Sequence, residues 1–320
     1  MKVLTSVVTG MVLATGLVYS TGAVAEQQRV DEQLQVPADV FVKVENMRGE
    51  VSIKGTADSV ARVEGVLDEY ATGFIFALDG STLTIAVEMP QRGNFSGNDV
   101  TELEIWLPQS AELTLEGVSS DYAITGFNSD VRINTVSGDI TAKELQGDIR
   151  LNTVSGDVFA SEVGGRVQLK SVSGDIDDRN GNATVADYST TSGDIRVATP
   201  ATEVRVESVS GDIELTLSEV KELAAKSVSG DVEATFSLAN NGRVTANSVS
   251  GDVELAIRGE LNAKLSAVVS GGGSIVNRLN EQRAEESRWG VGAQLKSTVG
   301  NGSGVIDVTT MSGDIHFIKK

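Results

Sequence analysis

The sequence predicts an all-β fold, a parallel β-solenoid in which coils of about 18–20 residues stack into a rod. The triplet Ser-Gly-Asp occurs eight times, and the first seven copies are separated by 18, 18, 19, 18, 19 and 21 residues. Apolar residues alternate with polar ones on both sides of each copy. Repeats of this length are typical of solenoids, and a period of two is typical of strands with one buried face.

The alternative is a meander of hairpins, in which each glycine turn would fold its two flanking strands against each other. One column of hydroxyl residues favours the solenoid, because parallel stacking in register places like residues above like and a meander does not need such columns. By the parity of the alternation these hydroxyls point inward, where we expect them to form a ladder beside the turn. They are Thr135, Thr153, Ser171, Thr190, Ser208, Ser227 and Ser248.

Each turn needs its glycine because a sharp corner often adopts a positive φ, where glycine is least strained. The aspartate that follows is expected to accept a hydrogen bond from a neighbouring main-chain N–H, as aspartate does in turns. The predicted turn glycines are Gly138, Gly156, Gly174, Gly193, Gly211, Gly230, Gly251 and Gly313.

The first 25 residues have the pattern of a secretory signal peptide. Lys2 precedes an apolar stretch from Val3 to Val18, and small residues at Ala23 and Ala25 fit a cleavage site. The apolar stretch is short for a transmembrane anchor, and no second stretch of about 20 apolar residues follows. We therefore expect a periplasmic, secreted or cell-surface protein without a transmembrane segment after cleavage.

The remaining chain, residues 26–320, is expected to form one solenoid domain. Residues 38–120 would make irregular N-terminal coils, residues 121–257 the regular repeats, and residues 258–320 the C-terminal coils with a charged insertion at 277–289. Both ends must be covered, because an open coil exposes unpaired strand edges.

Repeated Ser-Gly-Asp-Ile/Val turns behind a signal peptide resemble a bacterial "putative adhesin" family of unknown function. Ser137-Gly138-Asp139-Ile140 and its later copies carry the resemblance, which covers residues 38–320. The family implies a right-handed β-helix and a role at the cell envelope or surface. It brings no catalytic residues and no cofactor.

Composition excludes several classes of chemistry. The chain has no Cys and one His, which removes thiol chemistry and disulfides and disfavours zinc sites and catalytic triads. Its net charge is −19, so nucleic acid would be repelled. We therefore expect a non-enzymatic, adhesin-like scaffold whose solenoid faces bind an envelope polysaccharide or protein, without a cofactor.

A calcium-stabilised rod is one alternative, because a column of carboxylates can chelate hard cations. One aspartate per coil supplies too few ligands unless neighbouring coils share an ion, so a turn-capping role is favoured and no metal site is predicted. The column would contain Asp139, Asp157, Asp175, Asp194, Asp212, Asp231 and Asp252.

A polysaccharide-acting enzyme is the other alternative, and it requires a carboxylate pair in an open groove lined by aromatic residues. The adjacent pairs Asp177-Asp178 and Glu285-Glu286 do not suit it, because neighbours on a strand point to opposite faces. His316 is expected to be an ordinary surface residue. The run from Gly300 to Gly304 is expected to be a flexible corner, because a strand pattern follows it where a nucleotide loop needs a helix.

Partner contact is also possible in the charged insertion. Trp289 and Arg288 stand there, and tryptophan and arginine are common anchors at protein interfaces. The alternative is that Trp289 covers the end of the solenoid.

Overall fold

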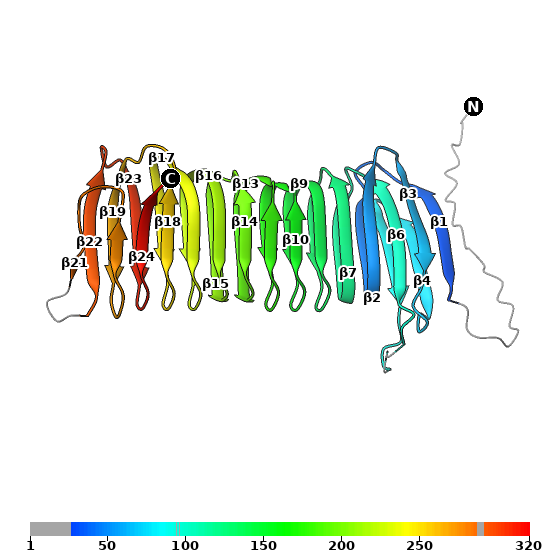
Figure 1. Ribbon diagram of the computed structural model, residues 1–320. Helices are drawn as coiled ribbons and strands as arrows, with labels where there is room; N and C mark the ends of the chain where they lie inside the picture. Colours follow the sequence, from blue (N-terminus) through cyan, green and yellow to red (C-terminus); the bar gives the residue numbers. More distant parts are fainter. Residues whose placement is uncertain (1–26, 94, 96, 287–290) are drawn as a thin grey trace, which may run out of the picture.

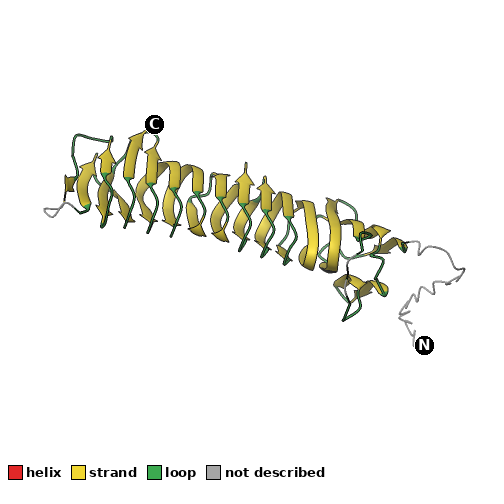
Figure 2. Ribbon diagram, turned by 60° about the horizontal axis from the view of Figure 1, so that its bottom comes forward, coloured by secondary structure: helices red, strands yellow, loops and turns green. Residues whose placement is uncertain are grey.

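The described residues form an all-β rod built from one long sheet of 24 strands, most of which pair in parallel (Figure 1). The structure is a computed structural model, and it describes residues 27–93, 95, 97–286 and 291–320. Strands and connecting loops alone make up this described part (Figure 2). The proposed signal peptide, residues 1–25, lies outside the described residues, as do Arg288 and Trp289.

The strands fall into three groups along the chain. The first group is β1 (Arg29–Gln35), β2 (Phe41–Thr56), β3 (Val60–Val66), β4 (Gly73–Asp79), β5 (Thr82–Glu88) and β6 (Thr101–Pro108). The second is β7 (Glu112–Phe127), β8 (Val131–Asn134), β9 (Ile140–Asn152), β10 (Val158–Ser161), β11 (Gly164–Lys170), β12 (Ile176–Arg179), β13 (Asn182–Ser192), β14 (Ile195–Thr199), β15 (Glu203–Ser210), β16 (Ile213–Lys226), β17 (Val232–Asn247) and β18 (Val253–Ile257). The third is β19 (Ala263–Val269), β20 (Ile275–Asn277), β21 (Glu285–Glu286), β22 (Ala293–Val299), β23 (Gly304–Thr310) and β24 (Ile315–Lys319).

Strands of successive repeats pair in parallel, and we call the strands at one level of the rod a layer. Val158 of β10 pairs with Ile140 of the preceding layer and with Ile176 of the next. The segments next to a Ser-Gly-Asp turn pair with the neighbouring layers and not with each other, since residues 131–134, before the first turn, pair with 149–152, and residues 140–143, after it, pair with 158–161. The hairpin meander is therefore wrong, and the predicted parallel stacking in register is confirmed.

The core is formed by the inward half of each alternating pattern. The first residue after each Ser-Gly-Asp triplet is at most 1% exposed throughout the rod. Burying one such aliphatic side chain contributes about 2 kcal/mol, so the repeated column accounts for a large share of the stability. Its members are Ile140, Val158, Ile176, Ile195, Ile213, Val232, Val253 and Ile315.

The N-terminal end departs from chain order. Strand β2, the first long strand, lies between β7 on one side and β5 and β6 on the other, and it pairs in parallel with all three. Beyond that layer the direction reverses, because β3 is antiparallel to β6, β4 is antiparallel to β5, and β1 is antiparallel to β3. Antiparallel strands therefore cover this end, as an open edge requires.

The C-terminal end uses the same arrangement. The last strands, β23 and β24, are inserted between the layer of β17 and β18 and the layer of β19 and β20, with parallel pairing on both sides. Strand β22 then covers β19 in antiparallel orientation, and the two-residue strand β21 pairs with β22. The charged insertion 277–289 thus begins at the end of β20, and its described part contributes to this cover.

Candidate functional site

The Ser-Gly-Asp turns stack along one long edge of the rod, which we call the turn edge (Figure 1). Its glycines are required mainly by the closeness of this stacking. A Cβ on Gly156 would lie 2.0 Å from the carbonyl oxygen of Gly138, and a Cβ on Gly174 would lie 1.9 Å from that of Gly156. Any side chain at these positions would collide with the main chain of the preceding layer.

The conformational reason predicted for these glycines holds only in the C-terminal half. Gly211, Gly230, Gly251 and Gly313 have φ values between 141° and 147°. Gly138, Gly156, Gly174 and Gly193 are outside the positive-φ region, so the prediction is wrong for these four. Steric contact between layers therefore unites all eight positions, whereas a positive φ does not.

Buried hydroxyls support the turn from inside. The predicted inward column is confirmed, since each of its members is at most 7% exposed. The hydroxyls do not form a ladder with one another. Thr153 Oγ1 lies 3.1 Å from the carbonyl oxygen of Gly138 and Ser171 Oγ lies 3.0 Å from that of Gly156, so each donates to the glycine of the preceding layer. Ser171 Oγ also accepts the Gly174 N–H at 2.9 Å, which joins two layers through one side chain.

The aspartates form a continuous hydrogen-bonded column on the outside of the turn edge. From Asp139 onward, the main-chain N–H of each donates to Oδ1 of the aspartate one layer earlier, over 2.7–3.0 Å. At the last layer the N–H of Ser274 donates to Asp314 Oδ1. The predicted turn hydrogen bond is thus confirmed, with the partner in the adjacent layer. The column runs through Asp121, Asp139, Asp157, Asp175, Asp194, Asp212, Asp231, Asp252 and Asp314.

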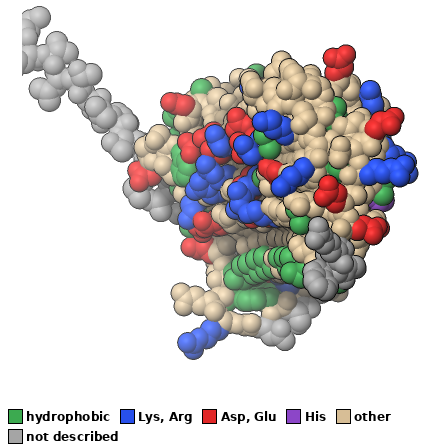
Figure 3. All heavy atoms as spheres, turned by 90° about the vertical axis from the view of Figure 1, so that its left-hand side faces the viewer, with side chains coloured by type: hydrophobic (Ala, Val, Ile, Leu, Met, Phe, Trp, Pro, Cys, Tyr) green, Lys and Arg blue, Asp and Glu red, His purple; other side chains and the backbone are tan. Residues whose placement is uncertain are grey.

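A column of exposed apolar side chains runs beside the aspartates. The residue before each Ser-Gly-Asp triplet points to solvent, and the valines at this position are 42–47% exposed. The end view of the rod shows hydrophobic side chains receding in a row along its lower edge (Figure 3). The column, interrupted once by Thr191, contains Val118, Val136, Val154, Val172, Val209, Val228, Val249 and Met311. Isolated exposed valines are ordinary, but a contiguous row is typical of a contact surface.

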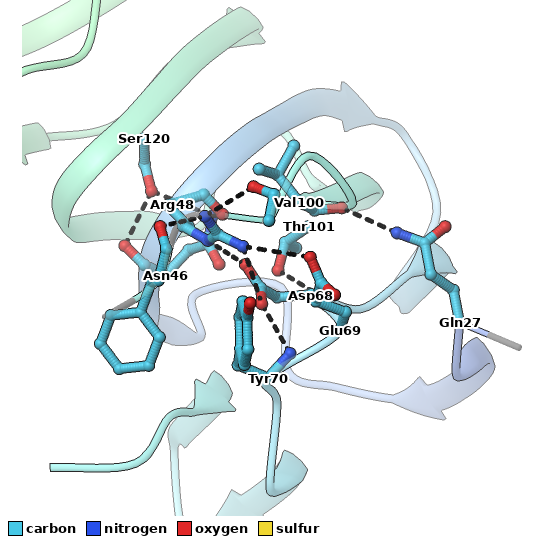
Figure 4. Close-up of polar contacts among 11 residues, drawn as sticks. Gln27, Asn46, Arg48, Asp68, Glu69, Tyr70, Val100, Thr101 and Ser120 are labelled. Atoms are coloured by element: carbon cyan, nitrogen blue, oxygen red, sulfur yellow. Dashed lines mark hydrogen bonds and ion pairs between the residues drawn. The ribbon is translucent and has the colours of Figure 1, made fainter. Parts of the chain in front are cut away.

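The turn edge is closed at its N-terminal end by a buried ion pair (Figure 4). Arg48 occupies the turn position that serine holds in the regular repeats, since it pairs with Ser119 in the next layer. Its guanidinium donates to the fully buried Asp68 and to the carbonyl oxygens of Phe95 and Gly97, at 2.8 and 3.0 Å. These bonds fasten the turn to the segments that cover the end, and they leave Arg48 committed to a structural role.

A hollow of about 740 Å³ lies at the N-terminal end of the rod, on the outer surface of the sheet formed by β1, β2, β3 and β6. It combines several carboxylates with Trp106, as the enzyme alternative requires. The side chains of Lys54 and Arg62, from the strands that flank β6, both lie over the Trp106 ring at 5.7 and 5.4 Å. These cations compete with any sugar ring for the faces of the indole. The carboxylates are Asp31, Glu50, Glu64, Glu102 and Glu104.

The other candidate carboxylates and the histidine are not brought together. Asp178 is fully buried and accepts a hydrogen bond from Tyr188 Oη at 2.5 Å, whereas its neighbour Asp177 points outward and pairs with Arg179, as the strand alternation predicted. Burial raises the pKa of Asp178 to about 6, and the Tyr188 hydrogen bond opposes this shift. His316 is on the surface of β24, 3.9 Å from Glu254.

Three further expectations concern the glycine run at 300–304, metal binding and membrane-spanning segments. Gly304 begins β23, so the predicted strand follows the glycine run. Within the described residues, no three Asp, Glu or His side chains form a group that could hold a metal ion. Across that same part of the chain, no helix has the length and apolarity needed to cross a membrane.

The fold and the turn edge define a class, a β-repeat rod that displays regular columns of side chains along its length. The model "Toastrack DUF4097" matches residues 37–317, and the chain therefore belongs to this toastrack family. No curated protein matches it significantly.

Three solved structures are similar to this chain over most of their own length. A putative adhesin from Parabacteroides distasonis is 15% identical, with coverage of 73% of this chain and 94% of that one and a TM-score of 0.41. A putative adhesin from Bacteroides fragilis is 13% identical, with coverage of 93% and 100% and a TM-score of 0.40. A putative lipid binding protein from Parabacteroides distasonis is 13% identical, with coverage of 91% and 96% and a TM-score of 0.35.

Proposed function

We propose that the protein is a non-enzymatic scaffold of the bacterial envelope or cell surface that binds a polymer or protein partner along its turn edge. The proposal takes the stacked layers as a right-handed parallel β-solenoid and residues 1–25 as an export signal. One observation carries it, namely the row of exposed valines beside the aspartate column. A row of exposed apolar side chains in register is costly to leave in water unless a partner covers it.

Repetition makes such an edge suited to a long partner. Each Ser-Gly-Asp layer offers the same serine and aspartate, and all but two of these layers also offer the valine, so a linear molecule would meet nearly the same set of contacts at every step. Weak contacts at each layer then add over the length of the rod. An enclosed pocket for one small ligand is not needed.

Valine-to-serine substitutions test this function. The chain without its proposed signal peptide (residues 26–320) and the variant Val154→Ser/Val172→Ser/Val228→Ser would be sedimented with purified envelope fragments of the source bacterium. The control, Ala123→Ser/Ala198→Ser/Ala224→Ser, places three similar changes at outward positions of the strands, away from the turn edge. We expect the valine variant to lose most of its sedimentation and the control to retain it. Equal sedimentation of all three proteins would reject the turn edge as the binding surface.

The insertion offers a separate test. A variant without residues 277–289 removes Trp289 and Arg288, the predicted partner contacts. If this deletion abolishes sedimentation and the valine variant does not, the partner binds the end of the rod and not its edge.

A polysaccharide-acting enzyme remains the second candidate, favoured by the hollow that contains Trp106 and the carboxylates. Glu50 and Glu102 face each other across β2 and β6 in this hollow. If the chain cleaves an envelope polysaccharide, Glu50→Gln and Glu102→Gln should abolish the release of reducing ends. The calcium-stabilised rod is tested by heating with and without excess EDTA, because a bound ion raises the melting temperature.

A further inference from the structure

The turn edge carries two parallel columns of opposite character, and together they define the chemistry of a partner. One column is apolar, made of the valines, and the other is anionic, made of the aspartates. The aspartates use Oδ1 to accept the N–H of the next layer. Among the described residues no hydrogen bond or ion pair reaches Oδ2 of Asp139, Asp157, Asp212, Asp231 or Asp252.

Unpaired carboxylate oxygens in a row favour a cationic partner. Neighbouring aspartates are about one layer apart, roughly 5 Å, and repel each other by about 0.8 kcal/mol in water before salt screening. A basic group placed beside two of them relieves this repulsion and gains an ion pair. The net charge of −19 attracts such a partner from a distance.

The spacing of the layers selects among extended and helical partners. Parallel strands stack at about 4.8 Å, so every second aspartate recurs at about 9.6 Å. A polyproline II helix has three residues per turn and rises about 3.1 Å per residue, so each of its three side-chain rows recurs at about 9.3 Å. An α-helical turn of about 5.4 Å drifts from the layers by about 0.6 Å per layer, and the same-face repeat of about 6.8 Å in a β-strand matches neither one layer nor two.

Resting on the proposed function, we propose that the turn edge binds a proline-rich protein segment in the polyproline II conformation, with a lysine or arginine at every third residue. The basic row pairs with alternate aspartates, and the proline rings pack on the adjacent valines. The preformed polyproline helix loses little entropy on binding, which suits a shallow surface. Along the rod, four ligand repeats accumulate a mismatch of only about 1.2 Å.

Fluorescence anisotropy of labelled peptides, titrated with residues 26–320 of the protein, tests the proposed polyproline II binding directly. We expect (Pro-Pro-Lys)4 to bind, with an affinity that falls as salt rises from about 20 to 300 mM because exposed ion pairs are screened. Two control peptides are (Pro-Pro-Glu)4, which reverses the charge, and (Gly-Ser-Lys)4, which keeps the charge and its spacing along the chain but removes the polyproline conformation. We expect both to bind at least tenfold more weakly.

Matched variants locate the contact. Asp212→Asn/Asp231→Asn/Asp252→Asn removes three charges from the column while keeping Oδ1 as the acceptor for the next layer. Glu214→Gln/Glu233→Gln/Glu254→Gln removes three charges from the same layers. Each glutamate stands two residues after the aspartate of its layer, at an outward position of a strand. We expect the aspartate variant to weaken (Pro-Pro-Lys)4 binding by about tenfold, which corresponds to three exposed ion pairs, and the glutamate variant to change it less than twofold.

Three results would overturn the proposal, namely no binding of (Pro-Pro-Lys)4, equal binding of (Gly-Ser-Lys)4, or equal losses in the two variants. The envelope sedimentation experiment separates this outcome from failure of the proposed function. If the valine substitutions abolish sedimentation while no peptide binds, the turn edge has a partner of a different chemistry, such as a glycan.

Discussion

The main-chain N–H of Asp157 donates a hydrogen bond to Oδ1 of Asp139, 2.8 Å away and one layer earlier in the rod. The same relationship recurs from layer to layer, so each aspartate is both a turn residue and a link between turns. The carboxylate column is therefore held in place by main-chain N–H groups.

Asparagine and alanine at position 157 should separate the hydrogen bond from the charge. Asp157→Asn retains an oxygen that accepts the Asp175 N–H and removes repulsion, so we expect the free energy of unfolding to stay within about 0.5 kcal/mol of wild type. Asp157→Ala loses the acceptor and should cost about 1 kcal/mol. Urea unfolding measures both. Equal losses would show that the charge, and not the acceptor, stabilises the turn.

Gly156→Ala should be strongly destabilising. Its Cβ would lie 2.0 Å from the carbonyl oxygen of Gly138, so the two layers must move apart, and we expect a cost of about 3 kcal/mol or more. Gly272→Ala is the control, since a Cβ there meets nothing within 4 Å. Thermal unfolding compares the two variants, and a mild effect at Gly156 would contradict the close stacking of the turns.

Two serines of the buried column should respond differently to alanine. Ser171 Oγ donates to Gly156 and accepts from Gly174, so Ser171→Ala should cost about 2 kcal/mol. Ser208 Oγ is buried without a hydrogen-bond partner among the described residues, so Ser208→Ala should be neutral or slightly stabilising. Denaturant midpoints decide the matter. A larger loss at Ser208 than at Ser171 would refute this assignment of hydrogen bonds.

Asp178 should make the rod less stable as the pH rises. Burial raises its pKa from 3.8 to about 6, so folding favours the neutral acid. Its contribution to stability is complete below pH 3.8 and is lost as the pH rises through 6, a change of about 3 kcal/mol. Asp178→Asn removes the ionisation and should flatten the stability profile between pH 4 and 8. Parallel profiles for wild type and variant would exclude Asp178 as the origin.

Periodicity was sufficient to predict the repeat, the parallel pairing and the inward hydroxyl column. When layers stack in register, residues one period apart in the sequence lie directly above one another in space. It did not predict the exchange of layers at the ends. Strands β2 and β23 have the same alternating pattern as their neighbours, so the pattern cannot say which neighbours they pair with. Only the packing of the whole end determines that order.

The candidate site was predicted in part. The glycine and aspartate columns follow from the triplet, but the exposed valine column was not recognised as a surface. Its signal was present in the printed sequence, since a valine precedes six of the eight Ser-Gly-Asp copies at a position where the alternation breaks. The structural role of Arg48 could not be seen, because its partner Asp68 lies in an irregular excursion without a repeat to align it.

The exchanged layers at the two ends give the rod a fixed length. At the C-terminal end β22 covers β19 in antiparallel orientation, and at the N-terminal end the antiparallel β3 separates β1, the outermost strand there, from the parallel stack. These antiparallel strands disfavour fibre growth by addition at the tips. The rod therefore has a set number of layers, and a partner that matches their spacing must bind along the side of the rod.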